Sequence, residues 1–216
     1  MSSISAAEPD HDCPLCPRLA AFRDANRAAL PSYFNAPVPC LGPRDAKLLI
    51  VGLAPGLHGA NRTGRPFTGD YAGDLLYATL LELGLAEGIY DRRPDDGLVL
   101  KDCRIVNSVR CVPPQNKPLP AEIKACNAFL KAEMAAMPSY KAMLALGAIA
   151  HGAALTARGE RKSAFRFAHN AQHRLSDGMV LVDSYHCSRY NTNTGVLTPE
   201  MFRTAVATAK AAAGLV

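Results

Sequence analysis

The sequence is poor in aromatic residues, has no tryptophan and contains no long apolar run. Aromatic side chains make up 6% of its 216 residues. No stretch approaches the roughly 20 consecutive apolar residues that a membrane-spanning helix needs, so we expect no contact with a membrane. The N-terminal stretch MSSISAAEPDHDC is acidic and lacks the basic, then apolar, then small-residue order of a secretory signal. The sequence therefore predicts a cytoplasmic protein.

Internal repeats and low-complexity tracts are also missing. With 49% hydrophobic and 20% charged residues, the chain has neither the low hydrophobicity nor the high net charge of a disordered protein. Its length is that of one ordinary domain. We expect a single domain over residues 1–216, of which residues 1–12 form a flexible tail.

The charge balance is moderately basic. The formal net charge is +5, and 16 arginines stand against 8 lysines, which favours planar recognition of phosphate. Residues 158–174, RGERKSAFRFAHNAQHR, hold five basic residues, two histidines and one acid. Such a run is typical of a solvated loop, but it also permits a polyanionic partner.

Apolar runs and capping residues predict an alternation of strands and helices. Strands are expected at residues 47–55, 103–109, 140–146 and 179–185, where apolar, partly β-branched residues follow one another. Helices are expected at residues 74–83 and 120–137, after Gly147, and from Thr198 onward. This alternation predicts an α/β fold, a three-layer α/β/α sandwich around a mostly parallel four-stranded sheet.

Three polar loops follow the first, second and fourth expected strands. Their sequences are LAPGLHGANRTGRPFTGD, RCVPPQNKP and HCSRYNTNTG. Because ligands bind outside the carboxyl ends of parallel strands, these loops are the candidate site. The first loop has neither the Gly-Lys-Ser/Thr end of a nucleotide-binding P-loop nor a G-x-G-x-x-G pattern leading into a helix.

Within these loops, only a few side chains could carry chemistry. The first loop holds one carboxylate, Asp70, and one aromatic ring, Phe67. His186 ends the fourth strand, where a histidine is a candidate catalytic group. Ser188 lacks the G-x-S-x-G context of a hydrolase nucleophile.

The seven cysteines are an odd number, and a reducing compartment argues against a disulfide framework. Cys13 and Cys16 form a C-x-x-C pair, and Cys111 and Cys126 follow about a hundred residues later. This spacing is not that of a zinc ribbon. By spacing alone, an iron–sulfur cluster, a zinc ion and no metal are equally good interpretations.

Taken together, long motifs of this sequence resemble family 5 of the uracil-DNA glycosylases, the type-b enzymes. They are CPLCPRLAAFR, GLAPGLHGANRTGRPFTGDYAGDLLY, RCVPPQNKPLPAEIKAC and SYHCSRYNTNTGVLT. The resemblance implies hydrolysis of the N-glycosidic bond of uracil in DNA, and of other deaminated bases such as hypoxanthine or xanthine. It further implies a 4Fe–4S cluster on Cys13, Cys16, Cys111 and Cys126. Cys40, Cys103 and Cys187 lie outside the pattern and are expected to be buried as small hydrophobes.

The same resemblance implies a role for individual residues. Catalysis would fall to Asp70, His186 and Asn116. The base would be bound by Gly52, Leu53, Ala54, Gly56, Phe67 and Asn107. DNA would be contacted by Arg62, Arg65, Ser188, Arg189, Tyr190 and Asn191.

One departure within the superfamily concerns the first motif. Many relatives carry Asp, Glu or Asn there, whereas GLAPG offers only Leu53 and Ala54; the resemblance to the type-b enzymes implies that the water-directing role belongs to Asp70. No lysine is positioned by motif for a Schiff base, which predicts a monofunctional glycosylase. We expect it to act on DNA as a monomer, at the bacterial nucleoid. The alternatives are a non-catalytic, metal-stabilised nucleic-acid-binding protein and a hydrolase of free nucleosides.

Overall fold

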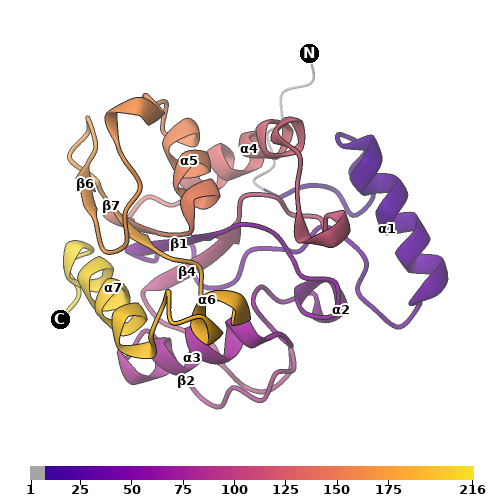
Figure 1. Cartoon of the computed structure of the whole chain (residues 1–216), viewed down its shortest axis with the longest axis horizontal. Coiled ribbons are helices and arrows are strands. Elements are labelled where there is room, and N and C mark those ends of the chain that lie inside the picture. The colour runs from indigo at the N-terminus through magenta and orange to yellow at the C-terminus, as the bar shows by residue number, and fades with distance from the viewer. Residues whose placement is uncertain (1–7) are drawn as a thin grey trace.

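The fold is built around one five-stranded sheet, seen in a computed structural model that describes residues 8–216 (Figure 1). The strand order is β4-β1-β5-β7-β6. The first four strands are parallel, and β6 pairs with β7 in the antiparallel sense. The bounds of the sheet strands are β1 (Leu48–Gly52), β4 (Cys103–Asn107), β5 (Ala142–Leu146), β6 (Gln172–Arg174) and β7 (Val180–Ser184).

Helices cover both faces of this sheet, as expected for an α/β/α sandwich. The first face carries α3 (Tyr71–Glu82) and α7 (Pro199–Ala212), whose apolar side chains share one core with alternate strand residues. The second carries α4 (Pro120–Ala135) and α5 (Ala148–Ala157) over the other set of strand residues. The remaining elements are α1 (Pro17–Ala29), α2 (Ala60–Thr63), β2 (Ala86–Glu87), β3 (Val99–Leu100), η1 (Pro114–Asn116), η2 (Lys162–Ala164) and α6 (Arg189–Asn193).

The four predicted strands are confirmed, and their completely buried centres explain why continuous apolar runs marked them. The sheet nevertheless has five strands and not four. The additional strand, β6, lies inside the basic run at residues 158–174 that was interpreted as a solvated loop. Its sequence Gln-His-Arg has no apolar residue, so hydrophobic patterning could not reveal it.

Helix starts follow local chemistry. Asp70 caps α3, its side chain accepting a hydrogen bond from the backbone N–H of Gly73 at 3.2 Å, so the helix begins three residues earlier than predicted. Thr198 caps α7 through the N–H of Met201, as its sequence predicted. Among residues 8–216, no helix is long and apolar enough to cross a membrane.

The expected N-terminal tail, residues 1–12, falls partly outside the described residues, which begin at residue 8. Over the described part, the tail is hydrogen-bonded to the body of the protein. Glu8 Oε1 accepts from the N–H of Cys40 at 3.0 Å, and Asp12 Oδ1 accepts from Arg27 Nη1 at 2.6 Å.

Candidate active site

The predicted loops meet at the carboxyl edge of the sheet and enclose a groove of about 550 Å³. Predicted site residues from three loops line it: Leu53, Ala54, Gly56, Asp70, Asn116, His186, Ser188 and Arg189. A smaller recess opens from the same place, and Phe67 and Asn107 contribute to its walls. Asp70 and His186 line both the groove and the recess. The structure therefore brings the carboxylate and the imidazole singled out in the sequence to one cavity.

Asp70 sits where the first loop turns into α3. Its backbone is extended, with φ −127°, and its side chain is largely buried against the loop. An ideal Cβ built at Gly59 would lie 2.4 Å from Asp70 Oδ2, and one at Gly56 would lie 3.2 Å from it. Burial raises the pKa of Asp70, against the lowering effect of the helix N–H groups. A carboxylate with a raised pKa is a stronger base than an exposed one.

His186 follows β7 and faces Phe67 across the recess. The two rings are stacked, with centroids 6.1 Å apart and planes inclined by 29°. Burial lowers the pKa of His186, so the ring is neutral at pH 7. Its backbone carbonyl accepts from Asn191 Nδ2 at 2.8 Å, which ties the histidine to α6. A neutral imidazole held in this way can donate one N–H to a ligand in the recess.

Asn107, the last residue of β4, lines the recess, and its neighbour Gly52, the last residue of β1, lies against it without lining the recess itself. Asn107 is buried, and its Oδ1 has no hydrogen-bond partner within residues 8–216. An ideal Cβ at Gly52 would lie 2.4 Å from that Oδ1 and 2.7 Å from the ring of Phe67. Position 52 therefore requires glycine if these two side chains are to approach each other. A buried, unpartnered amide oxygen is an acceptor ready for a ligand N–H.

The mouth of the groove is polar and projects aromatic and cationic side chains. Tyr190 is 75% exposed on α6, and the Arg189 guanidinium lies 5.4 Å from the ring centroid of Tyr71. Asn116, which also lines the groove, is exposed and has a left-handed φ of 57°. Arg62 is exposed on α2. Together they could contact a large anionic ligand entering the groove.

Comparison with known proteins adds to this geometry. Residues 39–210 match the model of the uracil DNA glycosylase superfamily. A type-5 uracil-DNA glycosylase of Thermus thermophilus is 46% identical over 208 residues, covering 94% of each chain. Those of Mycobacterium bovis and Pyrobaculum aerophilum are 41% and 37% identical over 94% of this chain, covering 79% and 90% of those relatives. The chain belongs to the uracil-DNA glycosylase superfamily. It groups with the type-5 members, which confirms the resemblance inferred from its motifs.

One predicted DNA contact does not fit the structure of this superfamily member. Arg65 is 6% exposed and forms two hydrogen bonds of 2.7 Å with the Asp96 carboxylate. Its Nε donates to Thr68 Oγ1 at 2.7 Å. The guanidinium lowers the pKa of Asp96 well below its usual range. Arg65 thus holds the first loop against the β2–β3 region and is not available to phosphate.

The four cysteines expected to bind a cluster come together in a second cavity of the glycosylase fold. Cys13 lies before α1, and Cys16 stands at the N-cap position of that helix. Cys111 follows β4, and Cys126 lies in α4. All four line this cavity. Ala54, from the groove, packs against the same cluster of side chains. The other three cysteines lie elsewhere: Cys103 and Cys187 are buried, and Cys40 accepts a hydrogen bond from Arg110 at 2.8 Å.

Sequence reasoning missed three residues that line the groove, Gly69, Tyr71 and Ala72. Tyr71 stands at the first position of α3, directly after Asp70, so its place in the motif was the available signal. It also missed a largely buried group of His151, His173 and Asp183.

Proposed function

We propose that this protein hydrolyses the N-glycosidic bond between uracil and deoxyribose in DNA and leaves an abasic site. The observation that carries the proposal is the single recess in which Asp70, His186, Phe67 and the unpartnered Asn107 oxygen meet. Several type-5 relatives are named uracil-DNA glycosylases, which supports the same reaction. A base inside a duplex cannot reach such a recess, so the nucleotide must flip out of the helix, which costs a few kcal/mol.

Base recognition follows from the walls of the recess. The Phe67 ring offers a face on which the flipped base stacks. Asn107 Oδ1 accepts the N–H on the edge of uracil, and the side-chain amide can also donate to a carbonyl. Gly52 leaves room for Asn107 and Phe67 beside it, and the backbone N–H groups of Ala54 and Gly56, which line the recess, would contribute donors. Since Leu53 and Ala54 leave the first motif without a polar side chain, we include deaminated purines among the substrates.

In the proposed mechanism, Asp70 directs a water molecule at the sugar. The water oxygen bonds to C1′ as the bond from C1′ to the base nitrogen breaks, and the bonding electron pair leaves with the base. The carboxylate takes the proton of the water, a contribution of about 10²–10⁴-fold in rate. Neutral His186 donates its N–H to the oxygen of the departing anion, and one such donor contributes about 3–4 kcal/mol in other enzymes. Asn116, on the rim, completes the polar surroundings of the sugar.

We assign DNA binding to the mouth of the groove. Ser188, Arg189, Tyr190 and Asn191 lie on or beside α6 and would enter the duplex where the base has left. Arg62 would contact phosphate. We propose that the protein does this as a monomer in the cytoplasm, at the nucleoid.

We further propose that Cys13, Cys16, Cys111 and Cys126 hold a 4Fe–4S cluster. A single zinc ion with bonds of about 2.3 Å would bring its sulfur ligands to about 3.8 Å from one another. Within residues 8–216, no three of these sulfur atoms lie within 4.8 Å of one another, so they do not form the compact set of ligands that one zinc ion needs. When bound, the cluster cross-links remote parts of the chain, and the hydrolysis itself needs no electron transfer.

Two buried arginines also favour the cluster. The positive charge of Arg23 favours the thiolate form of Cys111, and Arg110 lines the cavity. Only 4% of the surface of Arg23 and 1% of that of Arg110 are exposed. Arg23 Nε and Arg110 Nη2 lack a hydrogen-bond partner in the described part of the chain. Their ion pairs are long: Arg23 Nε lies 3.7 Å from the exposed Asp24 carboxylate and Arg110 Nη2 lies 3.4 Å from Glu8 Oε1. The two buried cations are therefore only partly compensated, which is costly. A cluster on four thiolates carries net negative charge and would compensate them.

The direct test is a labelled duplex oligonucleotide with one uracil, incubated with the protein and then treated with alkali and heat. Strand breaks at the uracil after alkali, and none before it, support a monofunctional glycosylase. Retarded complexes without breaks would instead indicate a non-catalytic DNA-binding protein. Release of the base only from free nucleosides would indicate a nucleoside hydrolase. Asp70→Ala and His186→Ala should abolish cutting while DNA binding persists.

A further inference from the structure

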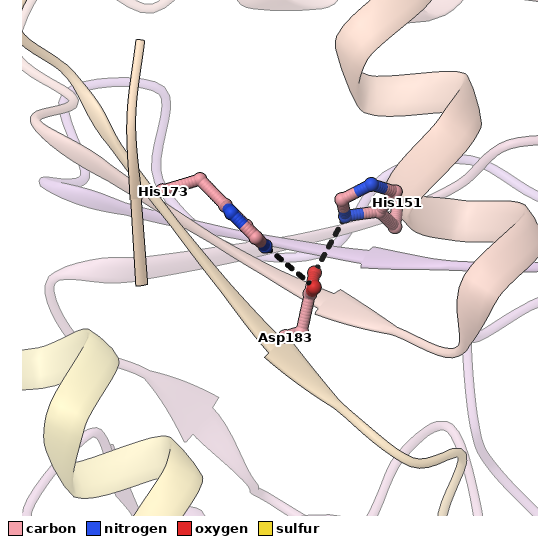
Figure 2. Close-up of side chains that lie close together, drawn as sticks. All are labelled: His151, His173 and Asp183. Carbon is pink, nitrogen blue, oxygen red and sulfur yellow. Dashed lines mark hydrogen bonds and ion pairs between the residues drawn. The ribbon is translucent and has the colours of Figure 1, made fainter. Parts of the chain in front are cut away.

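Two histidines share one buried aspartate, as Figure 2 shows. Asp183 of β7 is completely buried. His151 Nδ1, from α5, lies 2.8 Å from its Oδ1, and His173 Nε2, from β6, lies 2.8 Å from its Oδ2. His151 is 5% exposed, so its hydrogen bond with Asp183 lies in the interior of the protein. The three residues thus join three separate elements through one carboxylate.

The hydrogen-bond partners of His151 indicate its protonation state. Its Nδ1 faces the Asp183 carboxylate, and its Nε2 lies 3.1 Å from the backbone carbonyl of Phe165. An ionised carboxylate and a carbonyl both accept hydrogen bonds, so these two contacts favour a doubly protonated ring, an imidazolium. His173 needs only its Nε2–H to fill the second carboxylate oxygen. One buried negative charge is thereby balanced by one buried positive charge.

The surroundings agree with a charged His151. Burial on its own lowers the pKa of His151, but the hydrogen bond and the charge of Asp183 raise that pKa overall. The positive charge of Lys162, on η2, lowers the pKa of His151 and so opposes protonation of the ring. His173 is the remaining titratable group that faces the carboxylate.

The carboxylate also fastens the segment that leads into the active site. Asp183 Oδ2 lies 3.4 Å from the N–H of Ala168, and the Asp183 carbonyl accepts from Asn170 N at 2.8 Å. Next along this segment, the His169 ring stacks on Tyr185 with centroids 5.0 Å apart, and His169 Nδ1 accepts from Tyr185 N at 3.2 Å. Tyr185 immediately precedes His186.

We propose that His151, Asp183 and His173 form a positioning triad that holds the end of β7, and with it His186, in the geometry needed for base release. The inference rests on the proposed function, because it concerns what places His186 at the base. The triad also fastens the basic segment at residues 158–171 to the sheet. None of its three members lines the groove or the recess, so they act through Tyr185 and His186 and not on the substrate.

The first test reads protonation without any assay of activity. Nitrogen-15 NMR of the histidine rings at pH 7.5, assigned with His151→Asn, should show both nitrogens of His151 protonated. A neutral His151 ring would overturn the triad. So would a metal ion that is bound to the ring in the wild type and is lost in His151→Asn. The same spectra report on position: the ring signals of His186 should shift in His173→Leu and stay in place in Gln172→Leu. Gln172 is the exposed neighbour of His173 in β6 and serves as the matched control.

The second test separates positioning from folding by a conservative rescue. His173→Leu should lower kcat for uracil release about tenfold or more, since small displacements of a catalytic group are costly, while KM changes less than about twofold. His173→Gln keeps an N–H where Nε2 stands and should restore most of kcat. Equal kcat in wild type and His173→Leu would contradict the proposal. If the wild type does not release uracil, the proposed function fails, whereas the NMR results still decide the triad.

Discussion

Gly59 and Asp70 are packed so closely that a Cβ at position 59 would lie 2.4 Å from Oδ2 of the aspartate. Real Cβ atoms do not approach an oxygen to this distance, so any other residue at position 59 must push the carboxylate away. The carboxylate, however, is fixed on its other side by the N–H of Gly73 at the start of α3. The backbone of the first loop is therefore part of what positions the proposed base.

Gly59→Ala should displace Asp70 and lower kcat without altering the DNA-contacting rim. We expect a loss of at least about tenfold in kcat, because the displacement moves a catalytic group by a sizeable fraction of an ångström. Gly152→Ala is the matched control. Gly152 lies in α5, where a Cβ would meet only the flexible end of Lys162 at 3.7 Å. Gly152→Ala should leave kcat unchanged and stabilise the helix by roughly 0.5–1 kcal/mol. Steady-state kinetics would measure the first effect and thermal melts the second.

Asp70→Asn should make the protein more stable at pH 7. Because burial raises the pKa of Asp70, the folded state binds its proton more tightly than the unfolded state does. The folded state therefore loses stability as the pH rises from the unfolded value of 3.8 through the raised pKa. Asparagine is uncharged and still caps α3. Melting temperatures of both proteins should diverge at pH 7 and converge toward pH 4; a variant that is less stable at pH 7 would contradict a buried, costly carboxylate.

Asn107→Ala should separate function from stability in a similar way. Its Oδ1 has no partner within residues 8–216, so folding gains nothing from it there. We expect the melting temperature to stay the same or to rise slightly. Uracil excision should fall by about 1–3 kcal/mol in kcat/KM, the cost of an unmade hydrogen bond to the base. A large loss of stability with normal excision would show that the amide serves the fold and not the substrate.

Cys126→Ala should remove the cluster. Purified wild type is expected to be brown, with broad absorbance near 400 nm and about four iron atoms per chain, and the variant to be colourless and iron-poor. Cys103→Ala, a buried cysteine outside the second cavity, is the control and should keep its iron. Zinc in place of iron in a colourless wild-type protein would overturn the assignment.

The sequence predicted those parts of the molecule that depend on local pattern. The four parallel strands are continuous apolar runs, and their loops carry Asp70 and His186 to one edge. By contrast, α1 was missed because its buried stripe contains Leu19 together with the polar Arg23 and Asn26, which hides the helical period.

Contacts between distant segments could not be predicted. The partner that buries Arg65 is Asp96, 31 residues away, and nothing near Arg65 distinguishes it from a surface arginine. His151 and Asp183 are likewise 32 residues apart and meet only because α5 packs on β5, the strand next to β7 in the sheet. The sequence motifs predicted which side chains gather at the groove, whereas the contacts that support them came from the tertiary structure alone.

The most direct measurement is the single-turnover rate of uracil release from a duplex, with enzyme in excess, for wild type and Asp70→Asn. The account requires the variant to be slower by about 10²–10⁴-fold, while its affinity for duplex DNA stays within about threefold. A variant that releases uracil at the wild-type rate would contradict the role of Asp70 and, with it, the proposed mechanism.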